Sequence, residues 1–147
     1  MAGTITLVSD ERGSFGFSTL RHYRKITVSW VGDATDGSVP TLSIPLYGHV
    51  AKIIFNPGSP APTNGHNFRI LSNEDSAMDE MGAQINSTLS SGTTQVFYPT
   101  QNAAPTSRMQ TFLAGTYGLS ITGNIVASAQ GRFIIYMIDG YGKMLCK

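Results

Sequence analysis

The sequence has little charge: Asp, Glu, Lys and Arg make up only 13 % of its 147 residues, half the usual share of roughly 25 %. A free monomer normally keeps its surface charged for solubility. A surface built mainly from Ser, Thr, Asn, Gln and Gly is therefore expected to be either uncharged by design or covered by neighbouring proteins. The net charge is +1, and the longest basic cluster is RHYRK at residues 21–25, which argues against a nucleic-acid-binding protein.

Cysteine is almost absent, since Cys146 is the single one in the chain. One thiol forms no internal disulfide and supplies no cysteine cage for a metal, which favours a reducing compartment. Long apolar runs are absent as well, and residues 1–8, MAGTITLV, carry no basic segment ahead of an apolar one. We therefore expect neither a signal peptide nor a membrane anchor.

Side chains with catalytic or metal-binding chemistry are few and scattered. None of His22, His49 and His66 has a second His or Cys at metal-ligand spacing, so no metal site is expected. The acids of residues 74–80 are open to two interpretations: a carboxylate pair for glycoside hydrolysis or, as we favour, the solvated first turn of a helix. Nucleophile and phosphate-loop motifs are missing. The sequence predicts a protein that is not an enzyme and takes no cofactor.

Alternating apolar and polar residues predict several β-strands. In RKITVSWV, residues 24–31, the apolar Ile26, Val28 and Trp30 alternate with the polar Thr27 and Ser29, and DATDG at 33–37 follows as a turn. Both faces of RFIIYMI, residues 132–138, are apolar, so one face should lie in the core and the other against a second sheet or a subunit. Further extended segments are expected at residues 50–55, 67–71, 94–98, 117–122 and 125–129.

Proline marks two segments. Residues 39–47 read as an edge or loosely paired strand, because Pro40 and Pro45 donate no ladder hydrogen bonds. Residues 56–68, NPGSPAPTNGHNF, carry three prolines and the hairpin-turn pair NG at 64–65. They predict a rigid connector between two antiparallel strands, a surface suited to holding its shape against a partner.

The remaining segments complete an all-β architecture. The pattern of residues 74–89 favours a helix and a loop with a helical turn equally, and residues 99–108 are predicted to form a long loop. We expect one domain spanning residues 1–147, an antiparallel β-sandwich or jelly-roll-like fold with at most one short helix. Residues 1–12 are the candidate for an N-terminal arm.

The order of these features resembles small virion structural proteins of tailed bacteriophages. The resemblance rests on the strand ITVSW, the turn after it, the segments LYGHVAKIIFNPG and APTNGHNFRIL, and the closing strand GRFIIY, and it spans residues 26–138. After RIL at 69–71 the related chains continue with a turn of the Asp-Glu-Asp-Gly kind, whereas this chain reads SNEDS. The difference leaves the subfamily open.

The resemblance implies a capsid decoration (cement) protein that binds the outside of the phage head and bridges neighbouring major capsid subunits. The implied partners are the major capsid protein and further copies of this chain in a homotrimer, with no nucleic acid and no membrane; the implied location is the virion head, assembled in the host bacterial cytoplasm. An alternative is a head or tail accessory protein that binds carbohydrate or a host surface. The expected contact residues are Thr4, Ile5, Thr6, Leu7, Asn56, Pro57, Pro60, Pro62, Asn64, Thr100, Gln101 and Asn102.

Overall fold

The structure is a computed structural model that describes residues 1–14, 22–72, 74–75, 78–81, 85, 87–102 and 108–139. The described residues form strands and loops, with no helix among them. Seven strands build one antiparallel sheet in the order β1, β2, β9, β3, β8, β4, with β5 added beside β3. Their bounds are β1 Thr4–Ser14, β2 His22–Val31, β3 Leu42–Pro57, β4 Asn67–Leu71, β5 Gln95–Phe97, β8 Phe112–Thr122 and β9 Gln130–Asp139.

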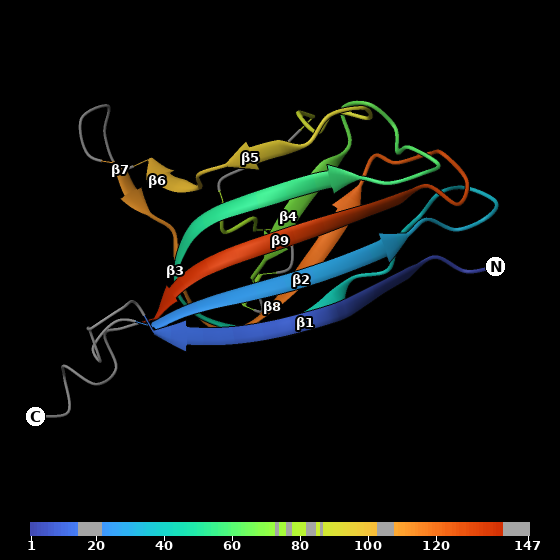
Figure 1. Cartoon of the computed structure of the whole chain (residues 1–147). Helices are drawn as coiled ribbons and strands as arrows, with labels where there is room; N and C mark the ends of the chain where they lie inside the picture. The colour runs from blue at the N-terminus through green and yellow to red at the C-terminus, as the bar shows by residue number, and fades with distance from the viewer. Residues whose placement is uncertain are drawn as a thin grey trace, which may run out of the picture.

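The long strand β3 belongs to both layers of the fold. Its residues 42–49 pair with β8, and its residues 49–57 pair with β9. Gly48, with a φ of 111°, stands where the strand changes partner, and the register shifts between Val50 and Lys52. As Figure 1 shows, β1, β2, β9 and β5 lie with the second half of β3 in a front layer, while β4 and β8 lie behind it. The result is a β-sandwich-like, all-β fold, as the sequence predicts.

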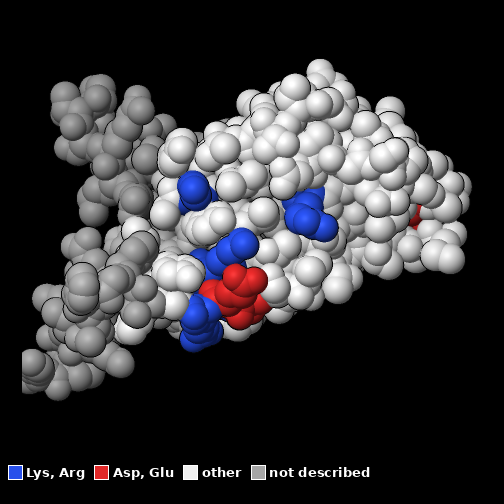
Figure 2. Space-filling view, viewed as in Figure 1, with Lys and Arg blue, Asp and Glu red and all other residues white. Residues whose placement is uncertain are grey.

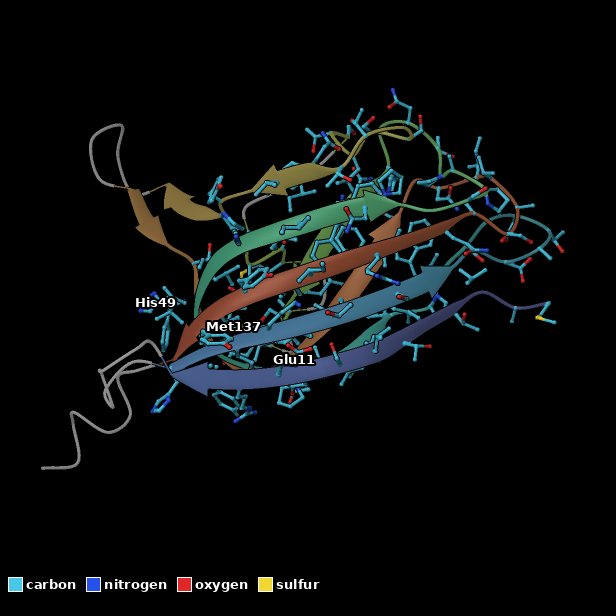
Figure 3. All side chains as sticks on the ribbon, viewed as in Figure 1. Glu11, His49 and Met137 are labelled. Atoms are coloured by element: carbon cyan, nitrogen blue, oxygen red, sulfur yellow. The ribbon has the colours of Figure 1, made fainter. Side chains whose placement is uncertain are left out.

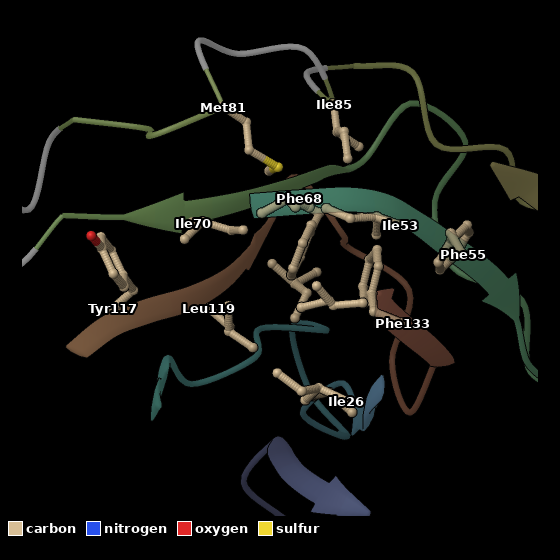
Figure 4. Packing of buried hydrophobic residues seen from close by; sticks show 14 of the residues in the cluster. Ile26, Ile53, Phe55, Phe68, Ile70, Met81, Ile85, Tyr117, Leu119 and Phe133 are labelled. Atoms are coloured by element: carbon tan, nitrogen blue, oxygen red, sulfur yellow. The ribbon is translucent and has the colours of Figure 1, made fainter. Parts of the chain in front are cut away.

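Apolar side chains from both layers meet in one core. On the front layer, Trp30 of β2 and Phe133 of β9 are almost completely buried. On the rear layer, Phe68 of β4 stacks on Phe133, with ring centroids 4.0 Å apart and an interplanar angle of 18° (Figure 4). This contact joins the layers directly, because Phe68 and Phe133 come from strands that do not pair with each other.

The alternation predicted for residues 24–31 is confirmed in β2, whose Ile26 and Val28 are fully buried. The turn at 33–37 is confirmed as well. The Asp33 carboxylate accepts a hydrogen bond from the backbone N of Thr35 at 2.6 Å, and Gly37 has a φ of 76°.

The prediction of two separate strands at 39–47 and 50–55 is wrong, because residues 42–47 and 50–55 both belong to the continuous strand β3, which begins at Leu42. Its first half nevertheless has edge character: within the described residues, 42–48 pair with β8 alone. Pro45 therefore sits where one side of the strand makes no ladder. The carbonyl of Pro45 accepts a hydrogen bond from the buried Arg24 side chain at 2.7 Å.

The proline-rich connector does not join paired strands. It leads from β3 to β4, which are separated in the sheet by β8, so it crosses from the front layer to the rear one. The NG pair at 64–65 is not a hairpin turn, although Gly65 has a φ of 83°. The connector is held instead by Asn124, whose Oδ1 accepts from Thr63 N at 3.0 Å and whose Nδ2 donates to Gly37 O at 2.7 Å.

The described part of residues 74–89 forms turns and isolated bridges, not a helix. Its backbone bonds β4 at the rear edge: Glu80 N donates to Ile70 O at 2.9 Å, and Phe68 N donates to Ile85 O at 3.2 Å. In a helix, these backbone N–H and C=O groups would bond each other, and the edge of β4 would be left unpaired. Met81 and Ile85 are buried over β4 (Figure 4).

Two further predictions are corrected. The predicted loop at 99–108 contains strand β6 (Thr100–Asn102) and ends where strand β7 (Arg108–Gln110) begins, and the two strands pair antiparallel. Residues 125–129, predicted as extended, form a turn in which Ser128 has a φ of 55° and Ala129 N donates to Val126 O. Segments as short as these carry too few residues to establish a period, so the pattern of hydrophobic residues identifies neither feature.

Candidate interaction surface

The front layer turns one sheet face away from the core, and we call this surface the outer face. Side chains alternate along each strand, so the partners in the ladder line up in rows across the strands. The rows are Thr6, Ser29, Arg132, Asn56; then Ser9, Thr27, Ile134, Ile54, Val96; then Glu11, Lys25, Tyr136, Lys52; then Gly13, Tyr23, Ile138, His49.

The centre of the outer face is apolar and only half buried. Ile134 and Tyr136 of β9 and Ile54 of β3 lie there, and Val96 of β5 is 46 % exposed. The expectation that the other side of residues 132–138 faces the core is confirmed, since Phe133, Ile135 and Met137 are fully buried. The outward side carries no second sheet in the described part of the chain. Figure 2 shows this face as an open surface on which most residues are uncharged.

Charge on the outer face is mainly positive. Lys25 and Lys52 occupy the same row on either side of Tyr136, and the Lys52 ammonium lies 4.6 Å from the centroid of the Tyr136 ring. Arg132 stands two rows away, and Glu11 on β1, labelled in Figure 3, is the acid in these rows. The rows therefore hold three cations and one anion.

A polar hollow of about 390 Å³ opens at one end of the outer face. Polar side chains around it come from Ser29, Asn56, Gln130 and Arg132, and apolar ones come from Trp30, Val31 and Pro57. Gly131 of β9 also lines it. Gly131 is needed there because a Cβ at this position would lie 2.7 Å from the Trp30 indole packed beneath it.

The predicted contact residues of the N-terminal segment lie on β1, which also contains most of the segment expected as an arm. Thr4, Thr6 and Leu7 are exposed, while Ile5 packs against the core. In the described residues β1 pairs with β2 alone, so it is an edge of the sheet. Thr6 shares a row of the outer face with the predicted contact residue Asn56.

The contact residues predicted in the proline connector divide by exposure. Asn56 and Pro57 end β3 and border the hollow, and Pro60 and Asn64 are exposed. Pro62 is buried and unavailable to a partner.

Thr100, Gln101 and Asn102 form β6, whose backbone the structure describes. Figure 1 shows the β6–β7 hairpin at the opposite end of β3 from the proline connector. The structure thus brings Thr6 and Asn56 of the first two segments into one row of the outer face and leaves the third segment apart.

Sequence reasoning missed Arg132, Lys25 and Lys52 as members of this surface. The signal was present in RFIIYMI, whose outward positions are Arg132, Ile134 and Tyr136. Lys25 and Lys52 become visible only through the register, because they flank Tyr136 from strands distant in the sequence.

The acids and histidines that were considered as catalytic or metal-binding residues contact the surrounding fold. The Asp79 carboxylate accepts backbone hydrogen bonds from Ile70 and Met81 at 3.2 and 3.1 Å. His66 is fully buried with its Nδ1 2.7 Å from Thr63 O, whereas His22 and His49 lie on the strands that flank β9. Within the described residues, no group of three or more His, Cys, Asp or Glu side chains is placed to hold a metal.

No helix in the described part of the chain is long and apolar enough to span a membrane. Compared with known protein families, with curated proteins and with solved structures, the chain shows no significant match.

Proposed function

We propose that this chain is a capsid decoration protein of a tailed bacteriophage, which binds the outside of the head and bridges neighbouring major capsid subunits. The proposal rests on the resemblance to small virion proteins and on one structural observation, the open outer face. An open sheet face with a half-buried apolar centre suits a contact with a protein surface. The action is mechanical, requires no cofactor, and takes place on the assembled head.

The size of the outer face favours bridging through more than one contact. Rows lie about 7 Å apart and strands about 4.8 Å apart, so the face measures about 20 Å on each side, or about 400 Å². A stable protein contact needs about 800 Å² on each partner. The outer face therefore serves as the centre of a contact to which exposed neighbours such as Pro60 and Asn64 add area. A homotrimer would multiply this contact and raise the overall affinity.

Co-sedimentation with undecorated heads of the phage that encodes the chain tests the proposal. Ile134→Glu places a charge at the centre of the outer face without entering the core, and we expect at least a tenfold loss of bound protein. Ser43→Glu is the matched control, because Ser43 is exposed on the half of β3 that pairs with β8. If the unaltered chain binds neither immature nor mature undecorated heads, the proposal is rejected.

One observation favours carbohydrate or host-surface binding as a second candidate. Tyr47 and Phe112 are 55 % and 51 % exposed, and the His49 ring lies 5.2 Å from Phe112. Register places these side chains on one face where β3 pairs with β8, and aromatic faces of this kind stack on sugars. Glycan-array binding that Tyr47→Ala and Phe112→Ala both abolish would favour this function; an array without signal would reject it.

A further inference from the structure

We propose that the partner of the outer face is an acidic protein surface, and that Arg132 pairs with a carboxylate side chain of that partner in the polar hollow. The inference rests on the proposed function, since it names the chemistry of the surface that a decoration protein would contact.

Arg132 has the surroundings of an unused binding group. It is exposed in the middle of its row, and its guanidinium makes no hydrogen bond or ion pair within the described part of the chain. Arg24 differs in every respect, because it is buried and bound to both oxygens of Asp10 at 2.8 and 2.7 Å. A free guanidinium presents a planar fork that fits a carboxylate with two parallel hydrogen bonds.

The neighbours of Arg132 supply further donors to the hollow. Ser29 and Asn56 stand on either side of it in the row. The Asn56 Oδ1 already accepts a hydrogen bond from Thr94 Oγ1 at 2.9 Å, so its amide nitrogen is left to donate. A carboxylate accepts several hydrogen bonds and offers none, which matches a hollow rich in donors.

The charge of the outer face disfavours an identical face as its occupant. Two copies stacked face to face would bring Lys25, Lys52 and Arg132 near the same cations of the other copy, with only Glu11 to offset them. Such like-charge contacts disfavour the pairing. A partner surface with carboxylates around an apolar centre complements both the cations and the half-buried Ile134 and Ile54.

The apolar centre also favours a protein over a nucleic acid. Binding to nucleic acid depends on many phosphate contacts from a continuous basic surface. Here Arg132 and the row of Lys25 and Lys52 are separated by the row that contains Ile134 and Ile54. An acidic protein surface offers carboxylates to the cations and apolar side chains to Ile134 and Ile54.

A peptide titration tests the chemistry without any phage component. The ¹⁵N-labelled full chain is titrated with Ac-Glu-Leu-Glu-NH₂, Ac-Gln-Leu-Gln-NH₂ and Ac-Lys-Leu-Lys-NH₂ at 20 and 200 mM NaCl. We expect chemical shift changes of the amides around Gly131 with the glutamate peptide and not with the other two peptides. These shift changes should be at least threefold smaller at 200 mM NaCl than at 20 mM. Arg132→Gln should abolish these shifts, whereas Arg132→Lys should retain part of them. Equal shifts from all peptides, or unchanged shifts in Arg132→Gln, would overturn the inference.

Binding to heads separates this inference from the proposed function. We expect Arg132→Gln to lower the amount of bound protein about tenfold, and Arg12→Gln, the same charge loss at an exposed site on β1, to lower it less than twofold. If the unaltered chain binds heads and Arg132→Gln binds equally well, the inference fails and the proposed function stands. If heads do not bind but the glutamate peptide still shifts Gly131, the proposed function fails and the acidic partner is supported.

Discussion

At the scale of single residues, the pair Arg24 and Asp10 is the clearest electrostatic feature of the fold. It joins β1 to β2, and Arg24 also donates to Pro45 O on β3. Removing one partner of a fully buried ion pair costs about 3–5 kcal/mol, and an exposed pair contributes less than about 1 kcal/mol. Because Asp10 keeps part of its surface in water, we expect Asp10→Ala to lower the free energy of unfolding by about 2 kcal/mol in urea titrations.

The same pair predicts a pH dependence. The hydrogen bond from the Arg24 side chain holds the pKa of Asp10 below its ordinary value. A carboxyl group with a lowered folded-state pKa stabilises the fold above its unfolded-state pKa, about 3.9, and loses this contribution as the pH falls through the folded value. The stability difference between the unaltered chain and Asp10→Asn should therefore be complete at pH 6 and shrink below about pH 4. A difference that does not shrink between pH 4 and pH 2 would contradict the assignment.

His66 predicts a second pH dependence at a higher range. Burial lowers the pKa of His66, against the opposing effect of its hydrogen bond with the Thr63 carbonyl. The unfolded chain then takes up the proton first, so stability falls as the pH drops below about 6.5 and levels off below the folded value, with a slope of at most about 1.4 kcal/mol per pH unit. His66→Asn should remove this slope in urea titrations between pH 7 and 5, while His22→Asn should keep it.

At the scale of elements, the bend in β3 decides how the layers form. Gly48 lies where β3 leaves β8, in a backbone conformation that side chains rarely adopt. We expect Gly48→Ala to destabilise the fold by about 1–3 kcal/mol. Gly92→Ala is the control, because a Cβ there meets nothing within 4 Å, and its effect should stay within about 0.5 kcal/mol. Equal thermal stability of the two variants would show that the bend tolerates a side chain.

At the scale of the whole molecule, the exposed edge of β1 predicts self-association. Leu7 and Val8 are 41 % and 56 % exposed, and the register shifts between Leu7 and Ser9. The bulge and the charged side chains of residues 10–12 oppose pairing of the second half of this edge with another chain. Residues 4–7 have neither feature. Sedimentation of the unaltered chain should show association that Leu7→Lys reduces and Thr116→Lys, on exposed β8 surface, does not. If the unaltered chain and both variants sediment with the same mass, the edge of β1 is not the site of self-association.

Deleting residues 1–8 is a poorer test of the same edge. The deletion removes half of β1 and uncovers β2, so a loss of binding would report the loss of fold as much as the loss of contact. Substitution at Leu7 leaves the strand in place.

Local pattern was sufficient for part of the fold and misleading for another part. The period of residues 24–31 predicted β2 correctly, because one buried face imposes alternation on a strand. The spacing of Met81, Ile85 and Leu89 suits a helix equally well, yet Met81 and Ile85 lie in turns and Leu89 forms an isolated bridge with His66. Backbone groups of the segment, Glu80 N and Ile85 O, bond the edge of β4 instead, and the segment's own sequence does not encode this long-range pairing.

The candidate surface divides in the same way. RFIIYMI by itself determined that β9 has two apolar faces, since that property depends on composition alone. Only the tertiary structure decided that Lys25 and Lys52 flank Tyr136 and that Ser29 and Asn56 flank Arg132. These neighbours are set by strand order and register, which arise from long-range pairing across the sheet, and no spacing along the chain encodes them.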